Sequence, residues 1–362
     1  MAIFYATLVS TYISYFLARI SYDKKLESLA TFWSVVVFII LALVSGGRGG
    51  IGGIGDTGAY KHSYTLLANN PSSFKFEGDF GFGLLSLALI QVSTDPQMLI
   101  FVTAIITNLF NTITFNKYRS YLELQVYLYI TSGYYTVTMN GIRQCLVASI
   151  LFACTNMIIE GKFKKYLAVV LLVSTIHKSA LILIPVYYIV RQEAWSKQIV
   201  KLIILSIIGV IFYNQLEPIL FKLIGSTQYG HYSEYNGGGS SLIRTIVNLV
   251  PVVLAYLKRE ELKGKWDNSN IFVNISVINL VFVAFGMYQW IFNRFTIYFQ
   301  LYNFILLPYI IKNCFKGKEK RLLYVGLIVC YFIFFYREQV MGLGMNYTSK
   351  YLNFEKLFYY IK

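Results

Sequence analysis

The stretch ATFWSVVVFIILALVS, residues 30–45, decides the fold of this chain. It has no charged side chain, and it nearly reaches the roughly 20 apolar residues that an α-helix needs to cross a hydrocarbon core. Similar runs recur along the 362 residues, of which 56% are hydrophobic and 14% charged, whereas a soluble domain carries roughly 25% charged residues. We therefore predict an all-α, polytopic integral membrane protein with about 10–13 transmembrane or re-entrant helices.

Positive charge is grouped in six short segments between the apolar runs. A net charge of +15 would suggest nucleic acid in a soluble protein, but Lys and Arg in short loops keep those loops in the cytoplasm. We expect a multi-pass protein of the cytoplasmic (inner) cell membrane, surrounded by the lipid bilayer, with no nucleic-acid partner. The six groups are Arg19, Lys24 and Lys25; Lys117 and Arg119; Lys162, Lys164 and Lys165; Arg191, Lys197 and Lys201; Lys258, Arg259, Lys263 and Lys265; and Lys312, Lys316, Lys318, Lys320 and Arg321.

Placing all six groups inside puts both chain ends outside and makes residues 1–362 a single transmembrane domain. The expected helices are 2–18, 30–45, 97–115, 122–138, 143–160, 199–214, 242–257, 271–291, 296–311 and 322–336.

Four further regions are not simple spans. Residues 78–93 cannot cross without breaking the charge rule, so we expect an in-plane or re-entrant helix on the outer side. Residues 166–190 have positive groups at both ends and arms of only about 12 residues, which predicts a re-entrant or tilted hairpin with its tip at residues 176–178. Residues 46–77 and 215–241 are expected to be external loops, and their Gly, Ser, Asn and Tyr content suits sugars.

The chemistry of a metal site is missing from the sequence. Four cysteines and three histidines show no ligand spacing, so we expect no metal ion and no cofactor.

Two polar positions inside or beside apolar runs are candidates for catalysis. Arg143 lies where a helix begins at the outer surface, and free N–H groups with an arginine form a site for a phosphate or an oxyanion. His177, with Lys178 beside it, lies in the middle of an apolar run. It could act as an acid–base group or as a hydrogen-bond donor to a phosphate. The alternatives are an arginine that reaches the headgroups and a structural histidine.

Asp56 is a third candidate, because it follows the glycine-rich stretch GGRGGIGGIG and glycines allow a ligand to approach the backbone closely. Arg48 and Lys61 flank it, and a flexible loop is the alternative. Three more cations are expected on the outer side, where they do not help to fix the topology, namely Arg244, Arg294 and Arg337. Together these cations predict an anionic substrate in the membrane, such as a lipid diphosphate.

Four short motifs in colinear order resemble the polysaccharide polymerases of the EpsG/Wzy type. They are G-D-x-x-x-Y from Gly55 to Tyr60, E-G-D-F-G-F from Glu77 to Phe82, M-N-G-I-R-Q from Met139 to Gln144, and H-K-S-A-L-I from His177 to Ile182. The resemblance implies a helical fold similar to GT-C glycosyltransferases. It also implies an enzyme that joins undecaprenyl-diphosphate-linked oligosaccharide units into exopolysaccharide, capsule, biofilm or O-antigen polymers outside the cytoplasmic membrane. Tyr60 and Gln144 become further candidates for substrate contact, and a flippase and a chain-length regulator become candidate partners.

Sugar transfer from a diphosphate needs a cation for the leaving group and a base for the acceptor hydroxyl. Arg143 is the expected cation, with Arg244 and Arg294 as second candidates, and no divalent metal is required. Asp56 and His177 both remain candidates for the base. The competing functions are a flippase or exporter of the same lipid-linked oligosaccharide, a membrane O-acyltransferase that modifies the polymer, and a structural scaffold.

Overall fold

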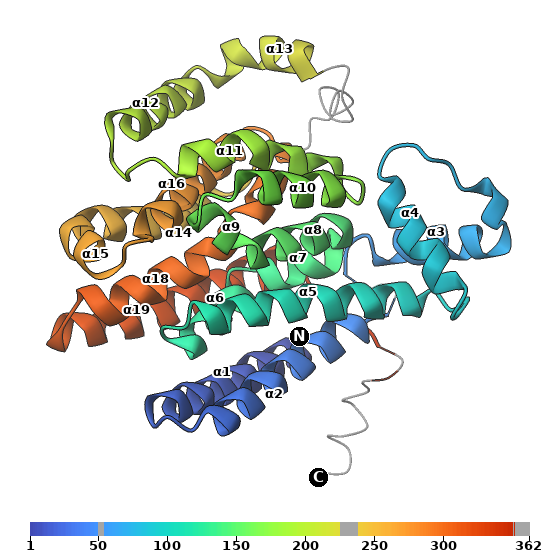
Figure 1. The fold of residues 1–362 in the computed structure, drawn as a ribbon, viewed down its shortest axis with the longest axis horizontal. Coiled ribbons are helices and arrows are strands. Elements are labelled where there is room, and N and C mark those ends of the chain that lie inside the picture. Colours follow the sequence, from blue (N-terminus) through green and yellow to red (C-terminus); the bar gives the residue numbers. More distant parts are fainter. Residues whose placement is uncertain (50–53, 225–237, 350, 352–362) are drawn as a thin grey trace. The chain divides into compact units, whose positions relative to one another are not determined.

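The computed structural model describes residues 1–49, 54–224, 238–349 and 351. Within these ranges the chain consists of helices joined by short connections, with one isolated antiparallel bridge between Arg48 and Ser349. The all-α prediction is therefore confirmed (Figure 1). The chain divides into two compact units: unit 1 comprises Met1–Ile184 and Lys316–Lys362, and unit 2 comprises Pro185–Phe315. Compact units can belong to one domain, so the single transmembrane domain over residues 1–362 stays a prediction.

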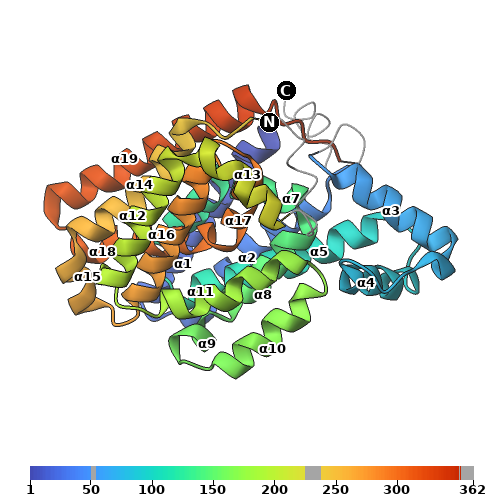
Figure 2. The same ribbon diagram turned by 90° about the horizontal axis from the view of Figure 1, so that it is seen from above.

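Unit 1 is built around α1, α2, α5, α6 and α8, which pack on one another in a bundle (Figures 1 and 2). These helices form because their apolar runs satisfy every backbone group internally, as a lipid environment requires. The outward face of α2 exposes Phe32, Val35, Ile39 and Leu43, spaced to form one stripe along the helix. The elements of unit 1 are α1 (Ala2–Asp23), α2 (Glu27–Gly46), α3 (Thr57–Asn69), η1 (Pro71–Ser73), α4 (Phe80–Ile90), α5 (Gln97–Lys117), α6 (Leu122–Thr131), α7 (Tyr134–Asn140), α8 (Ile142–Ala153), α9 (Thr155–Ile159), α10 (Phe163–Ser174), η2 (Lys178–Ile182), α19 (Gly317–Phe335) and the π-helix η5 (Tyr336–Gly342).

Unit 2 has α16 at its centre, packed on α14 and α18. Both faces of α16 are covered, since every residue from Ile271 to Asn279 is buried. The elements of this unit are α12 (Lys197–Ile211), α13 (Tyr213–Ile224), α14 (Leu242–Leu257), α15 (Arg259–Lys265), α16 (Ser269–Phe285), α17 (Ile291–Phe295), η4 (Thr296–Tyr298) and α18 (Gln300–Cys314), and α11 (Leu183–Val190) begins at the boundary with unit 1.

Four helices among the described residues are long and apolar enough to cross a membrane: α1, α2, α5 and the continuous stretch Gly317–Gly342. A fifth span results if Lys197–Ile211 and Tyr213–Ile219 count as one, although they are bent by 93°. The polytopic character is confirmed by length and composition. Of the other expected spans, 143–160, 242–257 and 271–291 correspond to the shorter apolar helices Ile142–Ala153, Leu242–Leu257 and Ser269–Phe285.

The structure interrupts two segments that we had predicted as continuous helices. Residues 122–138 are divided into α6 and α7 at Gly133, which has a φ of +82°, a conformation that suits glycine. A Cβ atom there would lie 2.5 Å from Nε2 of Gln339 on η5, so glycine is also needed for packing. Residues 143–160 are divided into α8 and α9 near Cys154. Both interruptions depend on tertiary contacts or local geometry that an apolar run does not reveal.

The regions that we had not predicted as simple spans are mostly helical. The expected outer loop 46–77 contains α3, which packs on α5, and the expected in-plane segment 78–93 contains α4. Residues 166–190 turn back after α10 at residues 175–177, and η2 then packs against α10, as the predicted hairpin requires. The loop 215–241 is α13 as far as Ile224, and residues 225–237 lie outside the described residues.

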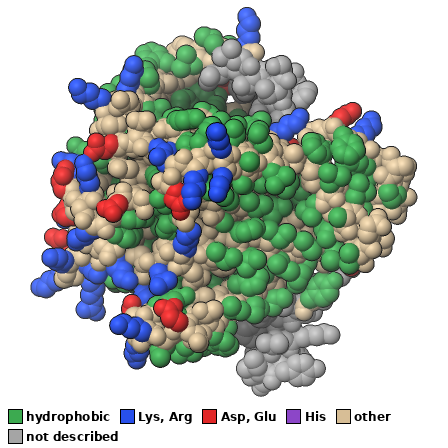
Figure 3. All heavy atoms as spheres, viewed as in Figure 1, with side chains coloured by type: hydrophobic (Ala, Val, Ile, Leu, Met, Phe, Trp, Pro, Cys, Tyr) green, Lys and Arg blue, Asp and Glu red, His purple; other side chains and the backbone are tan. Residues whose placement is uncertain are grey.

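One group of charged side chains of unit 1 lies at the end where α1 gives way to α2 (Figure 3). There Arg19 forms an ion pair with Glu123, the guanidinium of Arg119 lies 4.3 Å from the centroid of the Tyr22 ring, and Lys320 lies over Tyr121. Segments far apart in sequence thus bring their cations to the same end, which is the arrangement that the positive-loop pattern predicts.

The cationic segments of unit 2 also meet one another. Lys263 pairs with Glu193, Lys265 donates to the carbonyl of Asn313 at 2.5 Å, and Lys258 lies over the Phe315 ring. Each unit, taken by itself, therefore has one strongly cationic end.

Candidate functional site

The starts of α3 and α4, the corner between α7 and α8, and the 175–178 turn meet at one end of unit 1. These are the segments that carry the four colinear motifs. Below them lies an apolar cluster that includes Phe82, Leu99 and Ile142, with Tyr60 and Ile176 packed against it. The cluster fixes the backbone of four separate segments, so the polar groups above it have defined positions.

Arg143 and Asp79 form the ion pair at the centre of this end. Nη1 of Arg143 donates to Oδ2 of Asp79 at 2.9 Å, and the side chains are 40% and 10% exposed. Arg143 is the second residue of α8, where the helix N-terminus adds positive potential. The guanidinium is therefore partly neutralised, oriented and still open to an anion from the solvent side.

Asp79 has a second partner on another element. Its Oδ1 accepts a hydrogen bond from the backbone N–H of Lys178 at 3.1 Å. Nearby, the N–H of Gly81 donates to the carbonyl of Thr175 at 2.8 Å, and a Cβ atom on Gly81 would come within 2.8 Å of the Thr175 backbone. The start of α4 is thus held closely against the hairpin tip, and glycine at residue 81 makes the approach possible.

Two aromatic rings flank the guanidinium of Arg143. Its Cζ atom lies 5.8 Å from the centroid of the Tyr60 ring and 5.9 Å from that of Phe82. Burial raises the pKa of the Tyr60 phenol, and the adjacent Arg143 offsets part of that rise. Tyr60 therefore keeps its proton at physiological pH and remains a hydrogen-bond donor.

Asp56 is the exposed carboxylate of the site. Its backbone N–H donates to Oδ1 of Asn140 at 2.9 Å, which ties the start of α3 to the end of α7. Gly55 before it has a φ of +53°, and a Cβ atom there would overlap the Asn140 side chain. Within the described part of the chain, the Asp56 carboxylate itself forms no hydrogen bond or ion pair, so both its oxygens are available.

His177 stands at the start of η2, where its Nδ1 faces Ser179. The backbone N–H of Ser179 donates to Nδ1 at 3.5 Å, and the Ser179 hydroxyl lies 3.3 Å from the same atom. Because a backbone N–H can only donate, a neutral His177 in this arrangement carries its proton on Nε2. The geometry thus favours an imidazole that donates from Nε2, while the side chain of Lys178 is exposed beside it.

Arg48 lies below this surface, with a side chain that is 1% exposed. Its Nε donates to the Thr57 hydroxyl and its Nη2 to the carbonyl of Met139, both at 2.9 Å, and Nη1 donates to the carbonyl of Ser45. It therefore joins the end of α2, the start of α3 and the end of α7. Burial lowers the pKa of the Arg48 guanidinium to about 10, which leaves it charged at neutral pH.

The other residues predicted for the site differ in where they lie. Lys61 donates to Gln97, whose amide in turn donates to the carbonyls of Gly46 and Arg48, and Gln144 is buried in α8. Arg337 is exposed on η5. Arg244 on α14 and Arg294 on α17 belong to unit 2, where Arg294 lies over Trp290.

Two residues that organise this candidate site were missing from our candidate list. Asp79 and Asn140 lie within quoted motifs, E-G-D-F-G-F and M-N-G-I-R-Q, so the signal was present in the sequence. Their importance became visible only because tertiary contacts connect them to Arg143, Lys178 and Asp56.

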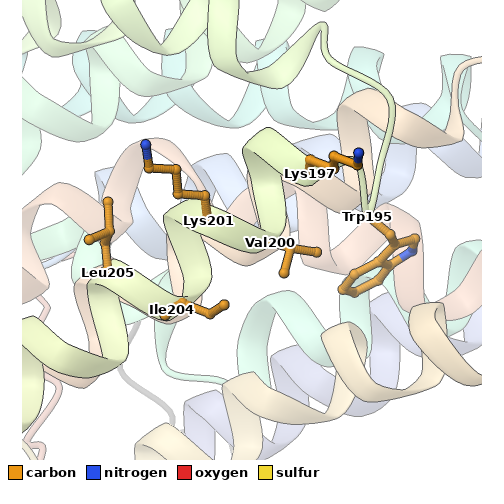
Figure 4. A pocket seen from close by; sticks show the side chains of 6 residues that line it. All are labelled: Trp195, Lys197, Val200, Lys201, Ile204 and Leu205. Atoms are coloured by element: carbon orange, nitrogen blue, oxygen red, sulfur yellow. The ribbon is translucent and has the colours of Figure 1, made fainter.

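No group of three or more His, Cys, Asp or Glu residues that could hold a metal ion occurs among the described residues. A shallow pocket of about 330 Å³ lies in unit 2 along α12, and Figure 4 shows its lining of Trp195, Lys197, Val200, Lys201, Ile204 and Leu205. It has neither a carboxylate nor an imidazole, so it lacks the acid–base groups of the site in unit 1.

The fold and this cluster define an all-α polytopic membrane protein with an oriented cation, an exposed carboxylate and an imidazole at one end of unit 1. A family model described as the EpsG family matches residues 31–353, and the chain therefore belongs to the EpsG family. This membership makes it a membrane protein of the polysaccharide-polymerase type. No curated protein and no solved structure matches the chain significantly.

Proposed function

We propose that the protein is a membrane glycosyltransferase that joins undecaprenyl-diphosphate-linked oligosaccharide units into a polysaccharide on the outer face of the cytoplasmic membrane. The observation that carries this proposal is the position of Arg143, which is held by Asp79 and partly exposed beside the segment that carries Asp56. Family membership supports the class of reaction, and the geometry supports this end of unit 1 as its site.

In the proposed reaction the acceptor hydroxyl attacks the anomeric carbon of the donor sugar. A new glycosidic C–O bond forms, the bond to the diphosphate breaks, and its electron pair moves to the departing phosphate oxygen. Arg143 stabilises that negative charge through the planar fork of its guanidinium, which suits phosphate oxygens. The products are the extended sugar chain and undecaprenyl diphosphate.

The hydroxyl proton goes to a base, and the geometry favours Asp56 over His177. The Asp56 carboxylate is exposed and lacks a protein partner among the described residues, whereas His177 accepts at Nδ1 and carries its proton on Nε2. We therefore assign Asp56 as the general base and His177 as a donor to the diphosphate or a sugar hydroxyl. The reaction as proposed needs no divalent metal.

Other residues receive supporting roles. Tyr60 supplies a phenol and a ring face to the substrate, and Lys61 and Lys178 add positive charge beside it. Arg48 and Gln144 are buried, so we propose that they hold the site in position and do not contact the substrate. Arg244, Arg294 and Arg337 remain proposed contacts of the lipid-linked substrate, with a flippase and a chain-length regulator as proposed partners.

The two ends of unit 1 support the outer location. The ion pair of Arg19 with Glu123 and the cations around it lie at one end, which the positive-loop rule assigns to the cytoplasm. α2 runs from that end toward the site, α5 runs from the site back to that end, and each is long enough to cross the bilayer (Figure 1).

The proposal is tested by replacing the native gene with an Arg143→Lys variant, which keeps the charge but loses the fork. We expect the polymer to disappear while single lipid-linked units accumulate outside, where an added lectin binds them in intact cells. A failed flippase would instead leave those units inside and hidden from the lectin. Normal polymer lengths in this variant would contradict the proposed site.

A further inference from the structure

We propose that Asp79 is a positioning residue that couples the diphosphate-binding cation Arg143 to the hairpin tip carrying His177. This inference rests on the proposed function and adds a residue to it. Asp79 uses its two carboxylate oxygens for two different elements: Oδ2 accepts from Arg143 on α8 and Oδ1 from the backbone of Lys178. A single side chain thereby fixes the distance between two groups that must meet the same substrate.

Asp79 differs from the other carboxylate of the site. Both its oxygens are engaged and its side chain is 10% exposed, so it is poorly placed to receive a proton from an acceptor hydroxyl. Asp56 is exposed, and its carboxylate has no partner in the described ranges. The two carboxylates therefore have different roles. Asp56 is placed to act on the substrate, and Asp79 acts through Arg143 and the hairpin tip.

The surroundings explain what the loss of Asp79 would do. Without it Arg143 keeps its charge and its rings, since Tyr60 and Phe82 still flank the guanidinium. Attraction for a diphosphate persists, but the direction of the fork and the place of the tip are no longer fixed. Loss of orientation lowers the rate of the chemical step far more than it weakens binding.

Two variants of Asp79 separate its contacts. Asp79→Asn keeps the volume but has one acceptor oxygen, so it can serve only one of the two partners. Asp79→Ala removes both contacts. The matched control is Asp23→Asn, which removes an exposed carboxylate from an Arg19 ion pair at the other end of unit 1.

Three measurements are made on the full-length protein in detergent or in membrane vesicles: the Kd for undecaprenyl diphosphate, polymer formation from native lipid-linked units, and amide hydrogen exchange of residues 175–182. For Asp79→Asn we expect a Kd within threefold of wild type at unchanged binding stoichiometry, and at least a tenfold loss of polymer formation. For Asp79→Ala we expect exchange of the tip amides to rise at least tenfold. Asp23→Asn should match wild type in all three, and Arg143→Ala should raise the Kd at least tenfold.

An unchanged binding stoichiometry shows that the slower Asp79→Asn variant is folded. If Asp79 served only the stability of the fold, the fraction of protein able to bind would fall together with the rate. Wild-type polymer formation in both Asp79 variants, or unaltered tip exchange in Asp79→Ala, would overturn the proposal. A Kd for Asp79→Asn as weak as that of Arg143→Ala would also overturn it, because Asp79 would then serve binding itself. If Asp79→Ala does not reach the membrane, Asp79→Asn decides alone. Wild-type behaviour of Arg143→Ala would instead sink the proposed function.

Discussion

Unit 1 has an arginine–carboxylate pair at each end, with the same 2.9 Å separation but different surroundings. Arg19 and Glu123 are 19% and 1% exposed, and Tyr324 donates to the same carboxylate, which closes the pair off. Arg143 and Asp79 are 40% and 10% exposed, and the guanidinium remains accessible. The exposure of the cation therefore separates two kinds of ion pair. A buried pair stabilises the fold, whereas a pair with an accessible guanidinium can also bind an anion.

The sharpest test of the two ends is which side of the membrane each faces, because the expected result is all or none. A cysteine introduced at Ser72, on η1, should react with an impermeant thiol reagent added to intact cells. A cysteine at Lys318, at the start of α19, should react only after the membrane is opened. Peptide-level detection distinguishes both from the native cysteines. Labelling of the Lys318 variant from outside would reverse the orientation and remove the outer site.

Arg143→Ala should cause the largest loss of activity, about 10²–10³-fold in polymer formation, because an oriented donor to the leaving group is removed. The measurement is the initial rate in membrane vesicles, normalised to the amount of protein in the membrane. Arg19 provides the contrast, since its removal should lower the amount of folded protein more than the rate per molecule. A greater loss of rate per molecule on removal of Arg19 than on removal of Arg143 would place the active site at the Arg19 end.

Asp56→Asn and His177→Gln sharpen the assignment within the site end. We expect Asp56→Asn to reduce the rate about 10²-fold, since the amide cannot accept the hydroxyl proton. His177→Gln should reduce it less than about tenfold, because the glutamine amide can still donate from near the Nε2 position. Rates at saturating substrate are compared for the two variants. If His177→Gln is the more damaged, the histidine is the base.

At the closed end, Glu123→Gln should destabilise the protein by about 2–3 kcal/mol, because the mostly buried Arg19 loses its buried counter-ion and keeps only the exposed carboxylate of Asp23. Asp23→Asn removes the other, exposed partner of Arg19 and should cost less than about 1 kcal/mol. Thermal unfolding in detergent measures both. Equal stability of the two variants would show that burial does not separate these pairs.

A chelator should have the smallest effect. If arginine carries the leaving-group charge, ethylenediaminetetraacetate should leave the rate of polymer formation within about twofold of its untreated value. The matched comparison adds Mg²⁺ back after chelation. A loss of activity that Mg²⁺ restores would make a divalent ion part of the reaction, and Asp56 its first candidate ligand.

The apolar runs were enough to predict much of the fold. α1, α2, α5, α14 and α19 lie close to the predicted residues, because a long uncharged run can satisfy its backbone in lipid only as a helix. The division at Gly133 was missed because neither the left-handed conformation of this glycine nor its close approach to Gln339, about 200 residues away, is visible in an apolar run. α3 was missed because its sequence is polar and rich in small residues, while its place is set by packing on α5.

Sequence alone determined that this chain lies in a membrane, which loops carry the positive charge, and that Arg143, Asp56 and His177 are unusual for their surroundings. Charge and hydropathy are properties of individual residues, so they can be read along the chain. Only the tertiary structure decided that Arg48 is buried, that Asp79 holds Arg143, and that Asp56 is left open. Burial and pairing depend on which distant segments meet, and that is fixed by packing of the whole unit.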